Sequence, residues 1–151
     1  MKIKAARLYH QSQPFADGPD IWRGQTEDGF DSCIVALEAE DGTIGWGEAA
    51  PLGAFYAEAF PEAMRAGIER LLPITIGLSA TAPYRLADTL NHAMLAQPAV
   101  KSAIDMAAWD LAAPVMKYPP SYLLGGAVGE PVPLLAPLHT SAPPSLSGLH
   151  D

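Results

Sequence analysis

The sequence predicts an α+β fold in which a three-stranded antiparallel meander is followed by a helical bundle. Between residues 31 and 51, apolar side chains fall on alternate positions, which is typical of half-buried strands. Beyond residue 58 they recur every three or four positions, as they do along one face of an α-helix. The tripeptide Glu40-Asp41-Gly42 is typical of a tight hairpin turn, because glycine readily adopts the positive φ that such a turn requires.

Three segments are expected to form the sheet, at 2–12, 31–39 and 43–51. In the second segment, alternation places four apolar side chains on one face, namely Cys33, Val35, Leu37 and Ala39. In the third, Ile44, Trp46 and Glu48 share one face and Gly45 and Gly47 share the other. Glycine inside a strand often marks a close neighbour, so we expect another backbone or a ligand against these two glycines.

The segment 13–29 is polar and contains glycine, so we expect a long loop between the first two strands. It nevertheless carries three large apolar side chains, Phe15, Ile21 and Trp22. Such residues in a mobile loop cost solubility unless they cover something. They are therefore the first indication of a lid.

The apolar spacing predicts helices over 58–72 and about 83–96, and a third helix that begins at Pro98 and continues to residue 113. Proline suits the first turn of a helix, which supports that start. Within the third helix Lys101 and Asp105 stand four residues apart, the spacing of a weak ion pair. Prolines at 114, 119 and 120 are expected to prevent helix beyond residue 113.

Composition excludes several classes of function. The chain has 151 residues, of which 49% are hydrophobic and 17% charged, so it can bury a sizeable core. A net charge of −8 lacks the basic surface that nucleic acids and anionic membranes attract, so we exclude both as partners. The sequence shows neither a membrane-spanning apolar run nor a signal peptide, and we expect a cytoplasmic protein. The single cysteine, Cys33, excludes an internal disulfide and is expected to lie in the core.

The residues alone indicate no catalytic set and no metal site. No two of the four histidines stand at a metal-ligand spacing, and the segment GWGEAAPLG lacks the lysine of a phosphate-binding loop. His92 follows Asp88 by four residues, which could orient an imidazole or form only a surface ion pair. Glu48 is the most interesting carboxylate. It could have a functional role, or it could simply end a strand and accept local hydrogen bonds.

Three segments resemble one enzyme family. They are GTIGWGEAAPLG at 42–53, VKSAIDMAAWDLAA at 100–113 and LLGG at 123–126. Together they resemble the mandelate racemase/muconate lactonizing enzyme branch of the enolase superfamily, over roughly residues 1–130. The opening KIKAARLYHQSQPFADGP is most similar to members that act on hydroxyproline or proline betaine. The resemblance implies an N-terminal capping domain at 1–113 and a linker at 114–130 that leads toward a catalytic barrel.

The resemblance implies that the two domains of such an enzyme supply different parts of its active site. The barrel supplies a lysine or histidine base and three acidic ligands for Mg²⁺, which stabilises the charge formed when the proton α to a carboxylate is removed. The cap supplies two loops that close over a small-molecule carboxylate, and these correspond to 13–29 and 51–60 here. The resemblance makes five residues candidates for substrate contact, namely Phe15, Ile21, Trp22, Phe55 and Tyr56. Packing within the cap, or between cap and barrel, is the alternative role for them.

The sequence departs from the family after LLGG. A barrel needs about 250 residues, whereas residues 127–151 follow here, and 131–150 contain no charged side chain and five prolines. We therefore expect an aberrant, disordered tail at 131–151, produced by a frameshift or truncation near residue 134. The expected function is that of a truncated remnant of a Mg²⁺-dependent racemase, epimerase or dehydratase, incompetent alone and binding no cofactor itself.

Two further expectations concern the isolated cap. Without a barrel, the helix at 100–113 would expose apolar surface and favour self-association. The alternative function is a stand-alone binding module that uses the loop aromatics on a partner, and a complete small enzyme is a third interpretation.

Overall fold

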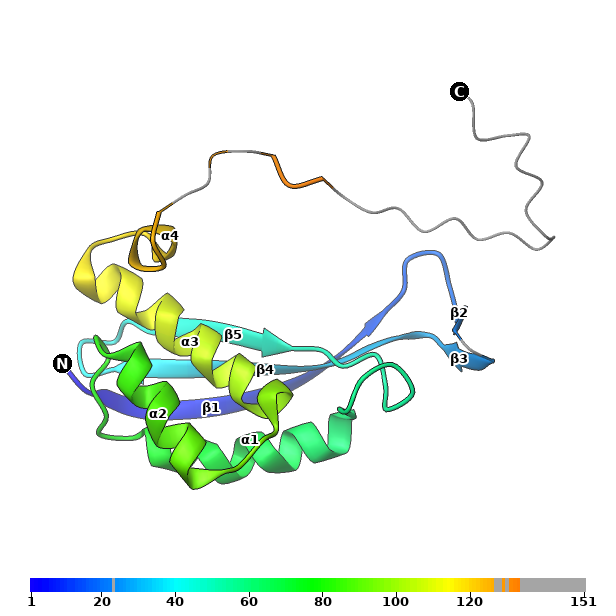
Figure 1. The fold of residues 1–151 in the computed structure, drawn as a ribbon, viewed down its shortest axis with the longest axis horizontal. Coiled ribbons are helices and arrows are strands. Elements are labelled where there is room, and N and C mark those ends of the chain that lie inside the picture. Colours follow the sequence, from blue (N-terminus) through cyan, green and yellow to red (C-terminus); the bar gives the residue numbers. More distant parts are fainter. Residues whose placement is uncertain (23, 127–128, 130, 134–151) are drawn as a thin grey trace.

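The computed structural model describes residues 1–22, 24–126, 129 and 131–133. Its elements follow one another as five strands and then four helices, which confirms the predicted α+β class. The three long strands form a sheet, α1 and α3 pack on one face of it, and α2 packs against both of these helices (Figure 1). The predicted tail lies, apart from Pro131–Pro133, outside the described residues. No helix in the described part of the chain is long and apolar enough to cross a membrane.

The main sheet contains β1 (Ile3–Pro14), β4 (Gly29–Ala39) and β5 (Ile44–Ala49), in the order β1-β4-β5. Both pairings are antiparallel, with Leu8 opposite Val35 and Val35 opposite Gly47. This confirms the meander. The first strand runs two residues beyond the predicted end at 12, because Pro14 still pairs with Gly29.

The segment 13–29 was predicted to be a loop, and that prediction is incomplete. It contains a small antiparallel hairpin made of β2 (Asp20–Trp22) and β3 (Gln25–Glu27). Strands of three residues are too short to show a hydrophobic period, which explains why the pattern did not reveal them. Gly24, with φ of +79°, supplies the backbone conformation that the tight turn needs.

The helices are α1 (Pro61–Thr75), α2 (Pro83–Ala93), α3 (Pro98–Met116) and α4 (Pro120–Leu123). Each begins with a proline in its first turn, where the missing N–H costs no helical hydrogen bond. The prediction that prolines would prevent helix beyond residue 113 is wrong. Pro114 cannot donate a hydrogen bond to the Asp110 carbonyl, but the loss of this one bond does not end α3, which continues to Met116, and Pro120 begins a new short helix.

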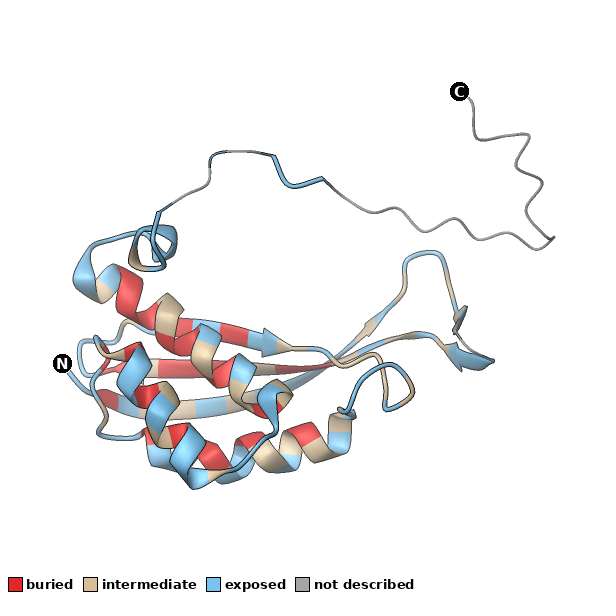
Figure 2. Ribbon diagram, viewed as in Figure 1, coloured by how far each residue is buried: buried red, intermediate tan, exposed pale blue. Residues whose placement is uncertain are grey.

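The core lies between the sheet and its helices (Figure 2). Cys33, Val35, Leu37 and Ala39 are all fully buried there, as the alternation predicted. Ile68 and Leu71 of α1 and Leu90 of α2 pack into the same cluster. Burial raises the pKa of the Cys33 thiol, which is consistent with a core side chain rather than a reactive one.

The backbone of α3 lies directly against β5. A Cβ atom at Gly47 would stand 2.6 Å from the backbone nitrogen of Ala107 and would also clash with the Ala103 carbonyl oxygen. Gly45 faces the backbone of Ala107 and Leu111 in the same way. The close neighbour predicted from the two strand glycines is therefore a helix of the same domain.

This packing buries one side of α3. Its buried side chains include Val100, Ile104 and Leu111, whereas Met106 is 44% exposed and Met116 is 38% exposed. The apolar surface that this helix offers to a second molecule is thus much smaller than the sequence suggested. Self-association through it stays a prediction.

Candidate functional site

Two loops emerge from the same end of the sheet. In an antiparallel β1-β4-β5 order, the end of β1, the start of β4 and the end of β5 meet at one edge. The connection between β1 and β4 therefore leaves the sheet beside the connection at 50–60, between β5 and α1, as Figure 1 shows. All five residues predicted to contact a substrate lie in these two connections.

The first connection projects from the body of the domain. Within the described ranges, the β2–β3 hairpin packs on no other strand or helix. Its root is fixed by Phe15, whose N–H donates to the Asp28 carbonyl at 2.8 Å and whose ring meets Phe30 edge-on at 5.2 Å between centroids. Farther out, Ile21 is 70% exposed, and the backbone of Trp22 pairs with Gln25. Phe15 therefore has a packing role, whereas Ile21 presents an apolar side chain to solvent.

The second connection is shaped by a turn at Gly53. The N–H of Tyr56 donates to the Gly53 carbonyl at 3.0 Å, and the Phe55 ring folds back over the glycine. A Cβ atom at Gly53 would lie 2.5 Å from the Phe55 ring, and its φ of +146° also favours glycine. Phe55 is half-buried by this contact, whereas Tyr56 is 60% exposed. Tyr56 is thus the second loop residue with a large exposed side chain.

Polar side chains tie the roots of both loops to the domain. His10 of β1 contacts Asp31, which lies at the start of β4 where the first loop returns. Arg65, in the first turns of α1 after the second loop, has Nη1 2.7 Å from His10 Nε2 and 3.5 Å from Asp31 Oδ2. Sequence reasoning missed this cluster. The alternation of β1 and β4 could have placed His10 and Asp31 on one face, but not in register with each other.

Glu48 lies at the end of β5 on the face of the sheet opposite the helices. It accepts hydrogen bonds from the Ser32 hydroxyl and from Gln13 Nε2, the latter at 3.0 Å. These contacts connect all three strands, so Glu48 has the hydrogen-bonding role that was one of its two interpretations. His92 and Asp88 form an exposed pair with 3.5 Å between Nδ1 and Oδ1, which matches the surface ion pair considered for them.

The described residues do not fit a magnesium site. Across 1–22, 24–126 and the few described residues beyond, no three His, Cys, Asp or Glu side chains gather where they could hold a metal ion. The chemistry of this end of the domain is instead that of apolar contact, through Ile21 and Tyr56, supported by a packed aromatic base.

Comparisons with known proteins agree with this geometry. Residues 24–125 match the family model described as mandelate racemase/muconate lactonizing enzyme, N-terminal domain. The chain is 31% identical over 144 residues to cis-3-hydroxy-L-proline dehydratase of Roseibium aggregatum, covering 95% of this chain and 39% of that protein. It is also similar to N-succinyl-L-Arg/Lys racemase of Bacillus cereus, at 27% identity over 97% of this chain and 40% of the racemase.

Solved structures show the same relationship. An enolase-superfamily member from Roseovarius nubinhibens superposes with a TM-score of 0.80 at 33% identity, over 88% of this chain and 36% of its own. The dipeptide epimerase of Enterococcus faecalis, complexed with Mg and the dipeptide L-Leu-L-Tyr, superposes with a TM-score of 0.75 at 29% identity. That match covers 83% of this chain and 35% of the epimerase. The chain thus spans about two fifths of the length of the curated relatives it matches.

Proposed function

The chain belongs to the mandelate racemase/muconate lactonizing enzyme family through its N-terminal domain, and we propose that it caps the active site of a magnesium-dependent enzyme of that family. The proposed reaction begins with removal of the proton α to a carboxylate, as in a racemase, an epimerase or a dehydratase. The observation that carries the proposal is the pair of loops at one end of the sheet, each with an exposed apolar side chain.

In this proposal the two domains have separate tasks. Ile21 and Tyr56 contact the apolar part of the substrate and exclude water from it, which strengthens the electrostatic interactions inside a closed site. Phe15 and Phe55 hold the loops in shape through their contacts with Phe30 and Gly53. The metal ligands and the base belong to a catalytic domain, so the described domain alone does not catalyse the reaction.

The proposed substrate is an amino-acid derivative or a proline-type acid. Relatives named for a hydroxyproline, for N-succinyl-amino acids and for a hydrophobic dipeptide support this class. The hydroxyproline enzyme combines 31% identity with a match over 95% of this chain, so a hydroxyproline is the first substrate to test. Apolar loop residues suit the ring or side chain of such a molecule, while its carboxylate is left to the catalytic domain.

A fusion protein tests the proposal. Residues 1–125 replace the matching N-terminal part of the Roseibium aggregatum dehydratase, and kcat/KM for cis-3-hydroxy-L-proline is measured. The fusion is expected to dehydrate the substrate, and Tyr56→Ala is expected to lower kcat/KM by about 10- to 100-fold, the usual effect of removing one apolar interaction from the transition state. Tyr84→Ala is the matched control, because Tyr84 is 73% exposed on α2.

The results of these experiments distinguish the capping role from the stand-alone binding module. A folded fusion with no activity, or one in which Tyr56→Ala and Tyr84→Ala behave alike, would contradict the capping role. A ligand that binds the unfused chain and protects Tyr56 would favour the stand-alone binding module instead.

A further inference from the structure

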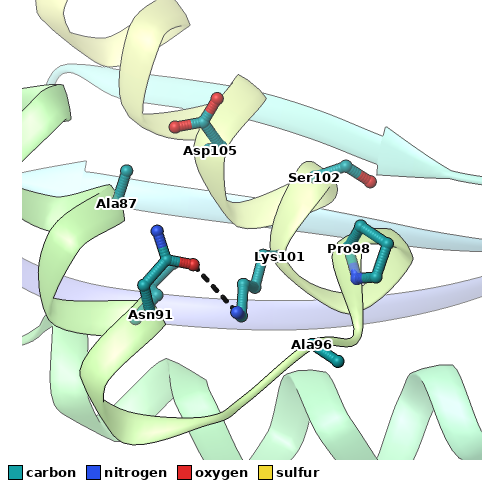
Figure 3. A pocket seen from close by; sticks show the side chains of 8 residues that line it. Ala87, Asn91, Ala96, Pro98, Lys101, Ser102 and Asp105 are labelled. Atoms are coloured by element: carbon teal, nitrogen blue, oxygen red, sulfur yellow. Dashed lines mark hydrogen bonds between the residues drawn. The ribbon is translucent and has the colours of Figure 1, made fainter.

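A groove lies between α2 and α3, on the helical layer of the domain (Figure 3). It has a volume of about 520 Å³, which is within the range of small-molecule sites. Its apolar lining comes from Ala87, Leu90, Ala96 and Pro98. Its polar lining consists of Asn91, Lys101, Ser102 and Asp105. A concave apolar surface with a few convergent polar groups is the usual form of a ligand site.

The two charged residues in the groove do not pair with each other. The sequence predicted an ion pair between Lys101 and Asp105, but Lys101 Nζ instead donates to Asn91 Oδ1 across the groove at 2.8 Å (Figure 3). Asp105 accepts a hydrogen bond from the side chain of Trp109. Among the residues described, the ion pairs include neither Lys101 nor Asp105. The groove therefore holds a cation and an anion, each without an opposite charge.

The surroundings of Asp105 disfavour the charged form of its carboxyl group. Burial raises the pKa of its carboxyl, and the indole of Trp109 only partly offsets that rise. A partly desolvated carboxylate without a cation is stabilised by any positively charged group that enters its surroundings. The backbone positions of Lys101 and Asp105 are one helical turn apart, about 6 Å along the axis of α3. Lys101 is the nearer of the two to the N-terminus of α3, where the helix dipole favours a negatively charged group on a ligand.

We propose that this groove binds a zwitterionic α-amino acid with an aliphatic side chain. The ammonium group binds the Asp105 carboxylate, the carboxylate binds Lys101 Nζ, and the side chain lies on the apolar lining formed by Ala87, Leu90 and Pro98. Lys101 and Asp105 line the same groove from successive turns of α3, so a single ligand that carries both charges can contact both side chains.

The backbone at one end of the groove supports a binding role. Ala96, which lines the groove, has φ of +51°, and its neighbour Gln97 has φ of +55°. Two successive residues other than glycine in the left-handed region are strained, and such strain is commonly found at ligand-binding positions. The groove lies on the helical layer, whereas the loop residues lie beyond the end of the sheet, so this inference does not depend on the capping role.

Titration of the purified chain tests the proposal, with backbone NMR shifts of α2 and α3 as the readout. The probes are L-valine, n-butylamine and butyrate, which carry both charges, the cation alone and the anion alone. L-Valine is expected to bind with a Kd of about 0.1–1 mM, a typical affinity for so small a ligand. Each single-charge probe is expected to bind at least about tenfold more weakly, as the loss of one charged hydrogen bond implies.

Two variants assign the charges. Asp105→Asn should weaken L-valine binding by about tenfold and abolish the response to butylamine. Lys101→Met should also weaken L-valine binding by about tenfold and should abolish the response to butyrate. Asp88→Asn, which changes an exposed carboxylate outside the groove lining, is the matched control and should leave L-valine binding unchanged. Far-UV circular dichroism confirms that each variant is folded.

The proposal is overturned if 20 mM L-valine shifts no groove residue, or if butylamine binds as tightly as L-valine. It is also overturned if both charge variants bind L-valine like the control. If Asp105→Asn does not fold, the Lys101→Met titration and the comparison of the three probes still decide the question.

Discussion

Gly47→Ala should destabilise the folded domain by about 3 kcal/mol, the upper end of the usual cost of overpacking. The added methyl group would meet the backbone nitrogen of Ala107 at 2.6 Å and the carbonyl oxygen of Ala103. Neither atom can rotate away as a side chain can, so α3 must move from β5 and separate the buried contacts around it. For a domain of this size the melting temperature should fall by about 10 °C.

Urea denaturation of the purified chain, followed by tryptophan fluorescence, measures this destabilisation. Gly67→Ala is the matched comparison, because its added methyl group would meet only side-chain atoms, Val100 Cγ2 at 2.6 Å and Cγ1 at 2.9 Å, and because alanine favours helix over glycine. It should cost less than Gly47→Ala. A destabilisation below about 0.5 kcal/mol for Gly47→Ala, the range of ordinary surface changes, would refute the close approach of α3 to β5.

Three further predictions concern other interactions. Asp110→Ala should cost about 1 kcal/mol, because the Asp110 carboxylate accepts a hydrogen bond from the backbone N–H of Trp46, on the edge strand, at 2.8 Å, and Asp110→Asn should cost less in the same urea titration. Because burial raises the pKa of the Asp105 carboxyl in the folded domain, ionisation of this group disfavours folding, and stability is lost as the pH rises through that pKa. The melting temperature of Asp105→Asn should therefore be higher than that of the native chain at pH 7 and equal to it at pH 3. Ile21→Ala should change the unfolding free energy by less than about 0.5 kcal/mol, because the side chain is 70% exposed, while lowering kcat/KM of the fusion protein.

The sheet and its covering helices could be predicted because their signals are local. Alternation identified the buried face of β4, and the two glycines of β5 indicated a close neighbour that proved to be the backbone of α3. Pro114 was misjudged because a proline inside a helix removes only one hydrogen bond, and the tertiary packing of a helix can outweigh that loss. The β2–β3 hairpin was missed because three-residue strands carry no period.

The site was harder to predict because it depends on contacts between distant residues. The sequence indicated apolar loop residues, but not that Phe15 and Phe55 would pack while Ile21 and Tyr56 stay exposed. The contact of Arg65 with His10 needs both strand register and helix rotation, and neither can be predicted from spacing. Likewise, helical spacing predicted that Lys101 would bind Asp105, whereas the arrangement of α2 offered it Asn91.

The most direct test of the capping role is the exchange of the substrate α-proton with solvent deuterium. Cis-3-hydroxy-L-proline is incubated in D₂O with Mg²⁺ and either the purified chain or the fusion protein, and exchange is followed by NMR. The capping role predicts exchange with the fusion protein and none above the uncatalysed rate with the chain alone. Exchange catalysed by the chain alone would contradict it, because the described domain would then supply the base itself.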